Sequence, residues 1–182
     1  KDIASGIFML LAVLFAGGFL TYDSNTVLTM SLASVIFTII TTALLVGDLE
    51  RPLRFLSIVL RPQMKSWLAR GAFILILFST LSGLFLAGEV AQKFELMNFD
   101  ALRQPWLIVT FPLAFMASIY TAFLFGQAEG RDLWQHPLLP VQLLIRSVLA
   151  AAAVMLLLYS IFDLNLDGFV ETIGMIYVAT LV

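Results

Sequence analysis

The chain contains no cysteine and only one histidine, His136, among its 182 residues. Cysteine thiolates hold iron–sulfur clusters and many structural zinc ions, and paired cysteines form disulfides. A haem held between two histidines needs a second histidine, which the chain does not have. We therefore expect no metal, no haem and no iron–sulfur cluster in this chain, which leaves it little redox chemistry of its own.

Charged residues are also scarce: they make up 12% of the chain, and the formal net charge is −2. Soluble domains are about 25% charged and about half apolar, whereas 61% of this chain is hydrophobic and its mean hydropathy is +1.01. A soluble protein of this length cannot bury so much apolar surface in one core. The composition predicts an integral membrane protein surrounded by lipid, and the net charge does not suggest a nucleic-acid partner.

Long apolar runs account for most of the chain. Five of them match the ~20 residues that a membrane-spanning helix needs: Ile3–Tyr22, Val27–Gly47, Ser66–Gly88, Pro105–Gln127 and Pro140–Phe162. A sixth run begins near Phe169 and is cut off at the last residue. We predict an all-α, polytopic transmembrane helix bundle that forms one domain over residues 1–182, with five full spans and a truncated sixth. We expect this chain to be a fragment of a longer protein.

The basic residues are distributed unevenly across the predicted membrane. Eight of the ten lie near the N-terminus, in residues 49–65 and 128–139, or at adjacent helix ends, and only Lys93 and Arg103 lie on the opposite side. Cytoplasmic loops of membrane proteins are enriched in lysine and arginine. The split predicts that the side with eight basic residues is cytoplasmic. Glu89 and Glu171 lie near the other side, where we expect them to be solvated.

Residues 49–65 connect the second and third spans in an unusual way. The stretch from Pro52 to Leu60 is too short to cross a membrane, and Arg54, Ser57 and Arg61 fall on one face of a helix. This pattern predicts an interfacial or re-entrant helix with a basic stripe. The arginines either anchor the segment to lipid phosphates or form a docking surface that covers a site.

The second span carries four hydroxyl residues on one face, Ser31, Ser34, Thr38 and Thr41, and Asp48 follows on the same face. Small hydroxyl residues usually let helices approach closely and bond across their interface. The alternative is a file of hydroxyls and water that delivers protons to Asp48, because an ionisable group at the membrane boundary often has a function.

The fourth span places Tyr120 and Gln127 on one face near the basic side. A phenol suits the carbonyl of a quinone, but it also suits the ordinary aromatic belt of a membrane protein. His136, in the next loop, could shuttle a proton near neutral pH or simply lie at the surface.

Two segments resemble a known family. The segment DLERPLRFLSIVLRPQMKSWLARGAF, which starts at Asp48, resembles the signature DLGRP…RF…P…S…WGA of the NrfD-like membrane subunits of polysulfide-reductase-type complexes. The segment YTAFLFGQAEGRDLWQHPLLP, from Tyr120 to Pro140, resembles the same family's YTGFLL…GRxLWxxxLLP. The resemblance implies a haem-free subunit of a respiratory complex in the prokaryotic cytoplasmic membrane, built on four-helix bundles with eight or more helices.

The resemblance also implies a function. Such subunits bind menaquinone or ubiquinone near one membrane face and exchange electrons with a docked ferredoxin-like iron–sulfur subunit. A further catalytic subunit, often of the molybdenum type, completes the complex. By position, Tyr120 matches the family tyrosine that contacts the quinone head, and Asp48 and Arg51 match an acid and a base near the same face.

The expected site therefore combines residues from both segments. Asp48 and Tyr120 are the expected catalytic residues, and Arg51 and Gln127 complete the expected quinone-binding set. The residues expected to meet the partner subunit are Arg54, Arg61 and His136. A nearby cation such as Arg51 would hold Asp48 ionised.

Two other functions remain open from the sequence. The subunit could be a structural anchor, or a conformational or proton-transducing element without quinone chemistry, and the entirely apolar stretch Gly6–Leu20 favours this reading. A secondary transporter would show an internal repeat with helices broken near the midplane. No such repeat is evident in the sequence.

Overall fold

The computed structural model describes residues 1–19, 22–47, 66–127, 136–162, 164 and 168–181. Every regular element in this part of the chain is a helix, which confirms the all-α prediction. The elements are α1 (Asp2–Leu11), the π-helix η1 (Ala12–Ala16), α2 (Ser24–Gly47), α4 (Trp67–Lys93), α5 (Asp100–Phe125), α6 (Leu139–Phe162) and α7 (Phe169–Leu181).

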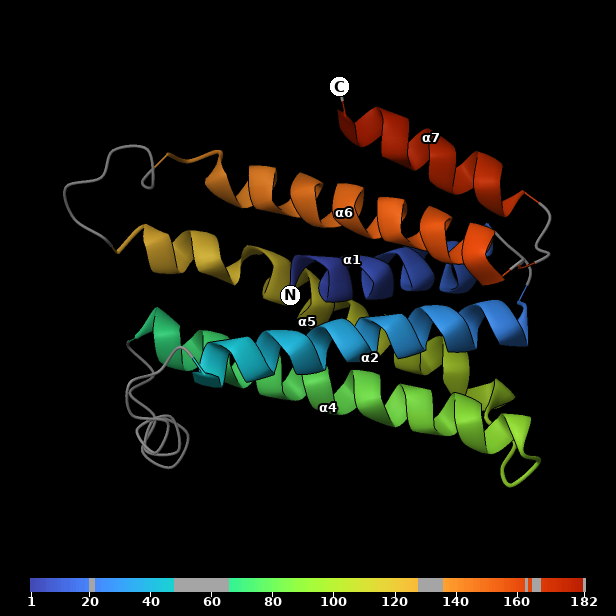
Figure 1. Cartoon of the computed structure of the whole chain (residues 1–182). Coiled ribbons are helices and arrows are strands. Elements are labelled where there is room, and N and C mark those ends of the chain that lie inside the picture. The colour runs from blue at the N-terminus through green and yellow to red at the C-terminus, as the bar shows by residue number, and fades with distance from the viewer. Residues whose placement is uncertain (20–21, 48–65, 128–135, 163, 165–167, 182) are drawn as a thin grey trace.

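The helices run up and down through one bundle (Figure 1). At one end α2 and α5 finish while α4 and α6 begin, and we call it the motif end because both family-like segments adjoin it. At the opposite end, the far end, α4 and α6 finish while α2, α5 and α7 begin. This alternation agrees with the predicted division of the connections between two membrane faces.

Four helices are long and apolar enough to cross a membrane, and they correspond to the second through fifth predicted spans. The first predicted span, Ile3–Tyr22, is too long, because the apolar helix there covers only Asp2–Phe15. It widens into the π-helix and stops before Gly18, whose φ of +73° suits glycine and ends the helical path. The predicted sixth helix is present as α7.

The fourth span begins earlier than predicted. Pro105 was expected at its first turn, yet α5 already begins at Asp100, so Pro105 and Pro112 both lie inside the helix. An acidic residue such as Asp100 stabilises a helix N-terminus by its interaction with the helix dipole. The apolar run alone did not reveal this extension, because Asp100 and Arg103 interrupt it.

Helix α1 lies inside the bundle, packed against α2, α5 and α6. Ile7, Phe8 and Leu11 are completely buried, and the Phe8 ring meets Phe78 and Phe85 of α4 edge to face, at centroid distances of 5.8 and 5.4 Å. A helix enclosed by other helices is expected to be hydrophobic all round. The central position of α1 thus explains why its residues from Gly6 to Leu11 have no polar side chain, without reference to function.

Candidate functional site

The hydroxyl face of α2 turns inward, as its spacing predicts. Ser31 and Ser34 are completely buried and Thr38 is nearly so. The Ser34 hydroxyl donates to the Ala4 carbonyl of α1 at 2.9 Å, whereas Thr38 and Thr41 donate to carbonyls one turn back in their own helix. The Ser34 bond joins α2 to α1, and all three hydroxyls have an acceptor. A proton path along them stays a prediction, since Asp48 lies outside the described residues.

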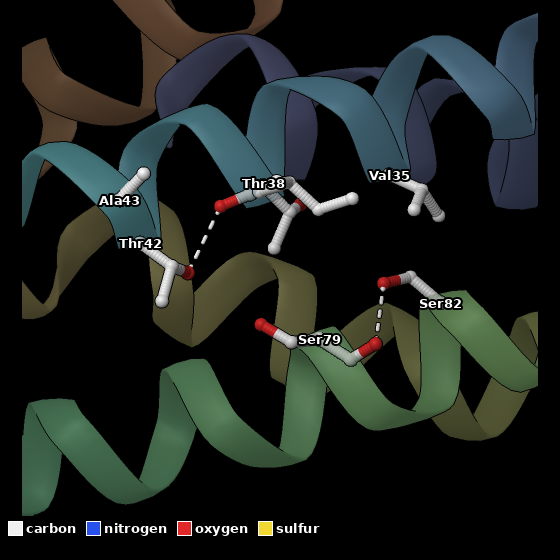
Figure 2. A pocket seen from close by; sticks show the side chains of 7 residues that line it. Val35, Thr38, Thr42, Ala43, Ser79 and Ser82 are labelled. Atoms are coloured by element: carbon white, nitrogen blue, oxygen red, sulfur yellow. Dashed lines mark hydrogen bonds between the residues drawn. The ribbon is translucent and has the colours of Figure 1, made fainter.

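A groove of about 440 Å³ separates α2 from α4 (Figure 2). Its lining consists of small and apolar side chains: Val35, Thr38, Ile39, Thr42, Ala43, Ser79 and Ser82. Thr42 donates to the Thr38 carbonyl at 2.9 Å, and Ser82 donates to the Ser79 carbonyl at 3.1 Å. Because the hydroxyls bond to their own helices, the groove offers mainly a hydrocarbon surface.

A second cavity, of about 390 Å³, lies at the motif end where α4, α5 and α6 meet. Its aromatic wall is formed by Trp67 and Phe123, whose rings stack with centroids 4.6 Å apart and planes inclined by 15°. The Arg70 guanidinium lies 4.8 Å from the centroid of the Trp67 ring. The wall is therefore flat and apolar, and the positive charge of Arg70 interacts with the π-electrons of the Trp67 ring.

Polar groups line the other side of this motif-end cavity. Gln127 and His136, which the sequence analysis assigned to quinone binding and partner docking, both line it. The His136 Nδ1 atom accepts the backbone N–H of Leu138 at 3.3 Å, so a neutral imidazole carries its proton on Nε2. The cavity can thus offer a ring wall, an amide and an imidazole donor to one small planar molecule.

Tyr120 lies one helical turn deeper in α5 and does not line the cavity. Its side chain is 8% exposed, and the Lys1 ammonium lies 5.4 Å from the ring centroid. The Tyr120 hydroxyl makes no hydrogen bond to another residue in the described part of the chain. Gln127, His136 and Tyr120 therefore gather at one end of the bundle, with Tyr120 set back towards the membrane interior.

Four other predicted site residues, Asp48, Arg51, Arg54 and Arg61, lie outside the described residues, as does the predicted helix over residues 49–65. They fall between α2, which ends at the motif end, and α4, which begins there (Figure 1). Among the described residues, no group of three or more histidine, aspartate or glutamate side chains could hold a metal ion.

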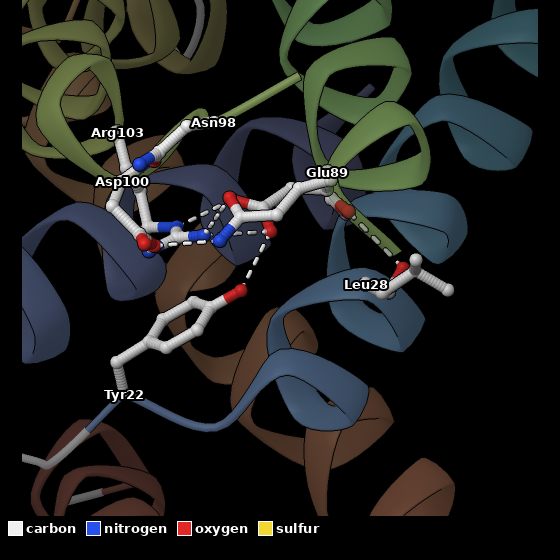
Figure 3. Close-up of polar contacts among 8 residues, drawn as sticks. Tyr22, Leu28, Glu89, Asn98, Asp100 and Arg103 are labelled. Atoms are coloured by element: carbon white, nitrogen blue, oxygen red, sulfur yellow. Dashed lines mark hydrogen bonds and ion pairs between the residues drawn. The ribbon is translucent and has the colours of Figure 1, made fainter. Parts of the chain in front are cut away.

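The far end holds a buried ion pair that the sequence pattern did not predict. Glu89 was expected to be solvated, yet it is 0% exposed. Arg103 Nε donates to Glu89 Oε1 at 2.7 Å, Arg103 Nη2 donates to Oε2 at 3.3 Å, and the Tyr22 hydroxyl donates to Oε2 at 2.7 Å (Figure 3). The Arg103 guanidinium also lies 3.5 Å from the centroid of the Tyr22 ring. A buried carboxylate needs such partners to stay charged.

The pair continues outward to the surface. Arg103 also donates to Asp100 and to Gln92, each at 2.7 Å, and Gln92 in turn donates to Asp100 at 2.7 Å. The network joins α4, α5 and Tyr22, which lies two residues before α2 begins. Burial, followed by the contact with Glu89, raises the pKa of Tyr22 to about 12.

The sequence does contain a feature that points to the pairing of Glu89 with Arg103. Ionisable residues at the ends of spanning helices usually pair with one another, and Glu89 and Arg103 close one span and open the next. The third predicted span ended just before Glu89 and the fourth began just after Arg103. Both residues were therefore assigned to the loop between the two spans. Only the extension of α5 back to Asp100 brings Arg103 alongside Glu89.

The sequence from residue 2 to residue 180 matches the family described as polysulphide reductase, NrfD. Searches of curated proteins and of solved structures gave no match. The match covers nearly the whole chain, and it agrees with the helical bundle and its apolar spans. This chain belongs to the NrfD family, whose members are polytopic membrane subunits of respiratory oxidoreductase complexes.

Proposed function

We propose that this subunit binds a quinone or quinol, of the menaquinone or ubiquinone type, at the motif end and exchanges its electrons with an iron–sulfur subunit docked there. The observation that carries the proposal is the motif-end cavity of about 390 Å³, with its stacked Trp67–Phe123 wall and its polar side of Gln127 and His136. Ligand sites are typically apolar cavities with a few converging polar groups.

The chemistry of a quinone head matches these groups. Its ring is flat and apolar, which suits contact with the aromatic wall that Trp67 and Phe123 form. Its two carbonyl oxygens accept hydrogen bonds, which the Gln127 amide and the Nε2 atom of His136 can donate. Tyr120, one turn deeper, can donate to the oxygen that enters furthest.

Oxidation of a quinol at this site also requires groups that accept its protons and electrons. Oxidation of a quinol releases two electrons and two protons, so the site needs two proton acceptors and an electron acceptor. His136 can accept one proton at Nδ1 when the bond from the Leu138 N–H opens, and Asp48, three residues before Arg51 in the sequence, can accept the other. The electrons pass to clusters of a ferredoxin-like partner that meets Arg54 and Arg61, since this chain has no cysteine to hold clusters.

We place the motif end on the cytoplasmic side of a prokaryotic inner membrane, because eight of the ten basic residues belong to it. The 182 residues of this chain contain no cysteine, which allows a direct test. A single cysteine in place of Leu138 should react with a membrane-impermeant maleimide only in inverted vesicles, and one in place of Phe94 only in right-side-out vesicles. The opposite pattern would reverse the orientation.

The site itself is tested by Gln127→Leu in the assembled complex. Loss of a hydrogen bond worth about 1 kcal/mol should raise the KM for a short-chain quinol about fivefold. The matched control is Gln142→Leu, because Gln142 is exposed on α6 and does not line the cavity. An unchanged KM in the Gln127 variant, together with no bound quinone in the extracted complex, would refute quinone binding here.

One observation favours a second function, that of a conformational or proton-transducing subunit. Glu89 is a buried carboxylate at the far end, and buried ionisable groups in membrane proteins are often functional. Under this alternative, extracted complex would contain no quinone assignable to this subunit, and Glu89→Gln would uncouple turnover from proton movement while leaving quinol KM unchanged.

A further inference from the structure

We propose that Gly71 of α4 is a positioning residue for Tyr120, and that the missing side chain at this position sets where the phenol hydroxyl meets the quinone. The inference rests on the proposed function, because it assigns a further residue to the same site. It also explains a close contact between one residue of each family-like segment, which hydropathy does not predict.

The contact is closer than any side chain at position 71 would allow. A Cβ atom on Gly71 would lie 2.4 Å from Cε2 and 2.5 Å from Cδ2 of Tyr120, and 3.4 Å from Cζ. Ordinary carbon contacts are about 3.5–4.0 Å. The Tyr120 ring therefore lies directly against the α4 backbone and occupies the space that a methyl group would need.

The Tyr120 ring is also restrained by other groups. Tyr120 is 8% exposed, the Lys1 ammonium lies 5.4 Å from the ring centroid, and Lys1 is itself held by a hydrogen bond to the Ser118 carbonyl at 3.2 Å. A ring packed between a backbone and a fixed cation cannot rotate freely to avoid an added methyl group. Its hydroxyl consequently points in one direction.

Separation of the two helices would be the other way to accept a methyl group, but α4 and α5 are fastened elsewhere. Glu89 and Arg103 join them at the far end with a 2.7 Å ion pair. Midway, the Trp106 indole N–H donates to the Leu81 carbonyl at 3.0 Å. With these links in place, an alanine at position 71 should displace the Tyr120 ring rather than part the helices.

The experiment measures quinol kinetics of the assembled complex carrying Gly71→Ala. We expect KM for a short-chain quinol to rise about fivefold, as for loss of one hydrogen bond, while kcat changes less than twofold. The control is Gly83→Ala on the same helix, because a Cβ there meets nothing within 4 Å. Its KM should equal that of the wild type.

A double variant separates positioning from general distortion. In a Tyr120→Phe background the ring remains but has no hydroxyl to misplace, so Gly71→Ala should raise KM no further. An equal rise in both backgrounds would overturn the inference. A rise for Tyr120→Phe with none for Gly71→Ala would overturn it too, whereas an unchanged KM in Tyr120→Phe itself would count against the proposed role of Tyr120 in quinone binding.

Assembly provides a second measurement if Gly71→Ala alone yields no complex. Tyr120→Leu removes the ring atoms that the new Cβ would meet, so the double variant Gly71→Ala, Tyr120→Leu should assemble. Failure of that double variant, with Tyr120→Leu alone assembling normally, would show that the methyl group acts on something other than Tyr120.

Discussion

The two ends of the bundle use polar side chains in opposite ways. At the far end Glu89, Arg103 and Asp100 satisfy one another in a closed network. At the motif end the side chains of Gln127 and Tyr120 make no hydrogen bond within the described part of the chain, and a cavity lies beside them. The comparison suggests that the far end holds the helices in register and that the motif end keeps its hydrogen-bonding groups available to a ligand.

The largest expected effect is a loss of stability when one residue of the buried Glu89–Arg103 pair is removed. Glu89→Leu leaves the Arg103 guanidinium buried with a weaker set of partners, and unpairing a buried charge costs about 3–5 kcal/mol. We expect the apparent midpoint of thermal unfolding of the detergent-extracted complex to fall sharply. Glu171→Leu is the matched control, because Glu171 is exposed on α7, and it should change stability by less than about 0.5 kcal/mol.

A double variant tests why the loss of Glu89 destabilises the bundle. Replacing both partners, Glu89→Leu with Arg103→Met, removes the desolvation cost of both charges and should restore much of the lost stability. If the double variant unfolds as readily as Glu89→Leu alone, the network has a role beyond mutual neutralisation of two buried charges.

At the motif end we expect a smaller effect, and it should change the KM for quinol rather than thermal stability. Trp67→Leu removes one ring of the stacked wall, and an aromatic contact contributes about 0.5–1.5 kcal/mol beyond its buried area. Quinol KM should rise about three- to tenfold, with little change in thermal stability. Leu68→Ala, at a 50% exposed neighbour on the same helix, should leave KM alone. A stability loss without a KM change would make the motif end a second structural clamp.

The last prediction concerns Tyr22 and alkaline pH. Its pKa is raised to about 12 in the folded protein, mainly by burial, against about 10 in an unfolded chain. A raised pKa contributes stability that is present below pH 10 and is lost as the pH rises towards 12. The wild type should therefore lose more stability than Tyr22→Phe over this range, as followed by circular dichroism. Parallel curves would mean that Tyr22 titrates normally.

Much of the architecture was predictable, for a physical reason. Spanning helices are long runs of apolar residues, and hydropathy along the chain reveals them without knowledge of their neighbours. The second to fifth spans and α7 were confirmed in this way. The first span was overestimated, because the break at Gly17 and Gly18 lies within an otherwise uniform apolar stretch.

The candidate site was less predictable. The spacing in the fourth predicted span indicated that Tyr120 and Gln127 share a face, and the family resemblance marked Tyr120 as functional. The structure alone shows that Gln127 and His136 line one cavity, that Trp67 and Phe123 stack beside it, and that Tyr120 stands one turn deeper. These relations join three helices far apart in sequence.

The amino-acid sequence by itself determined the membrane environment, the helical class, the order of the spans and the family, since each follows from local composition or from contiguous motifs. Only the tertiary structure decided that Glu89 pairs with Arg103 inside the far end and that Gly71 makes room for Tyr120. The reason is that charge pairing and steric fit depend on which helix faces meet, and helix rotation and register are set by packing across the whole bundle.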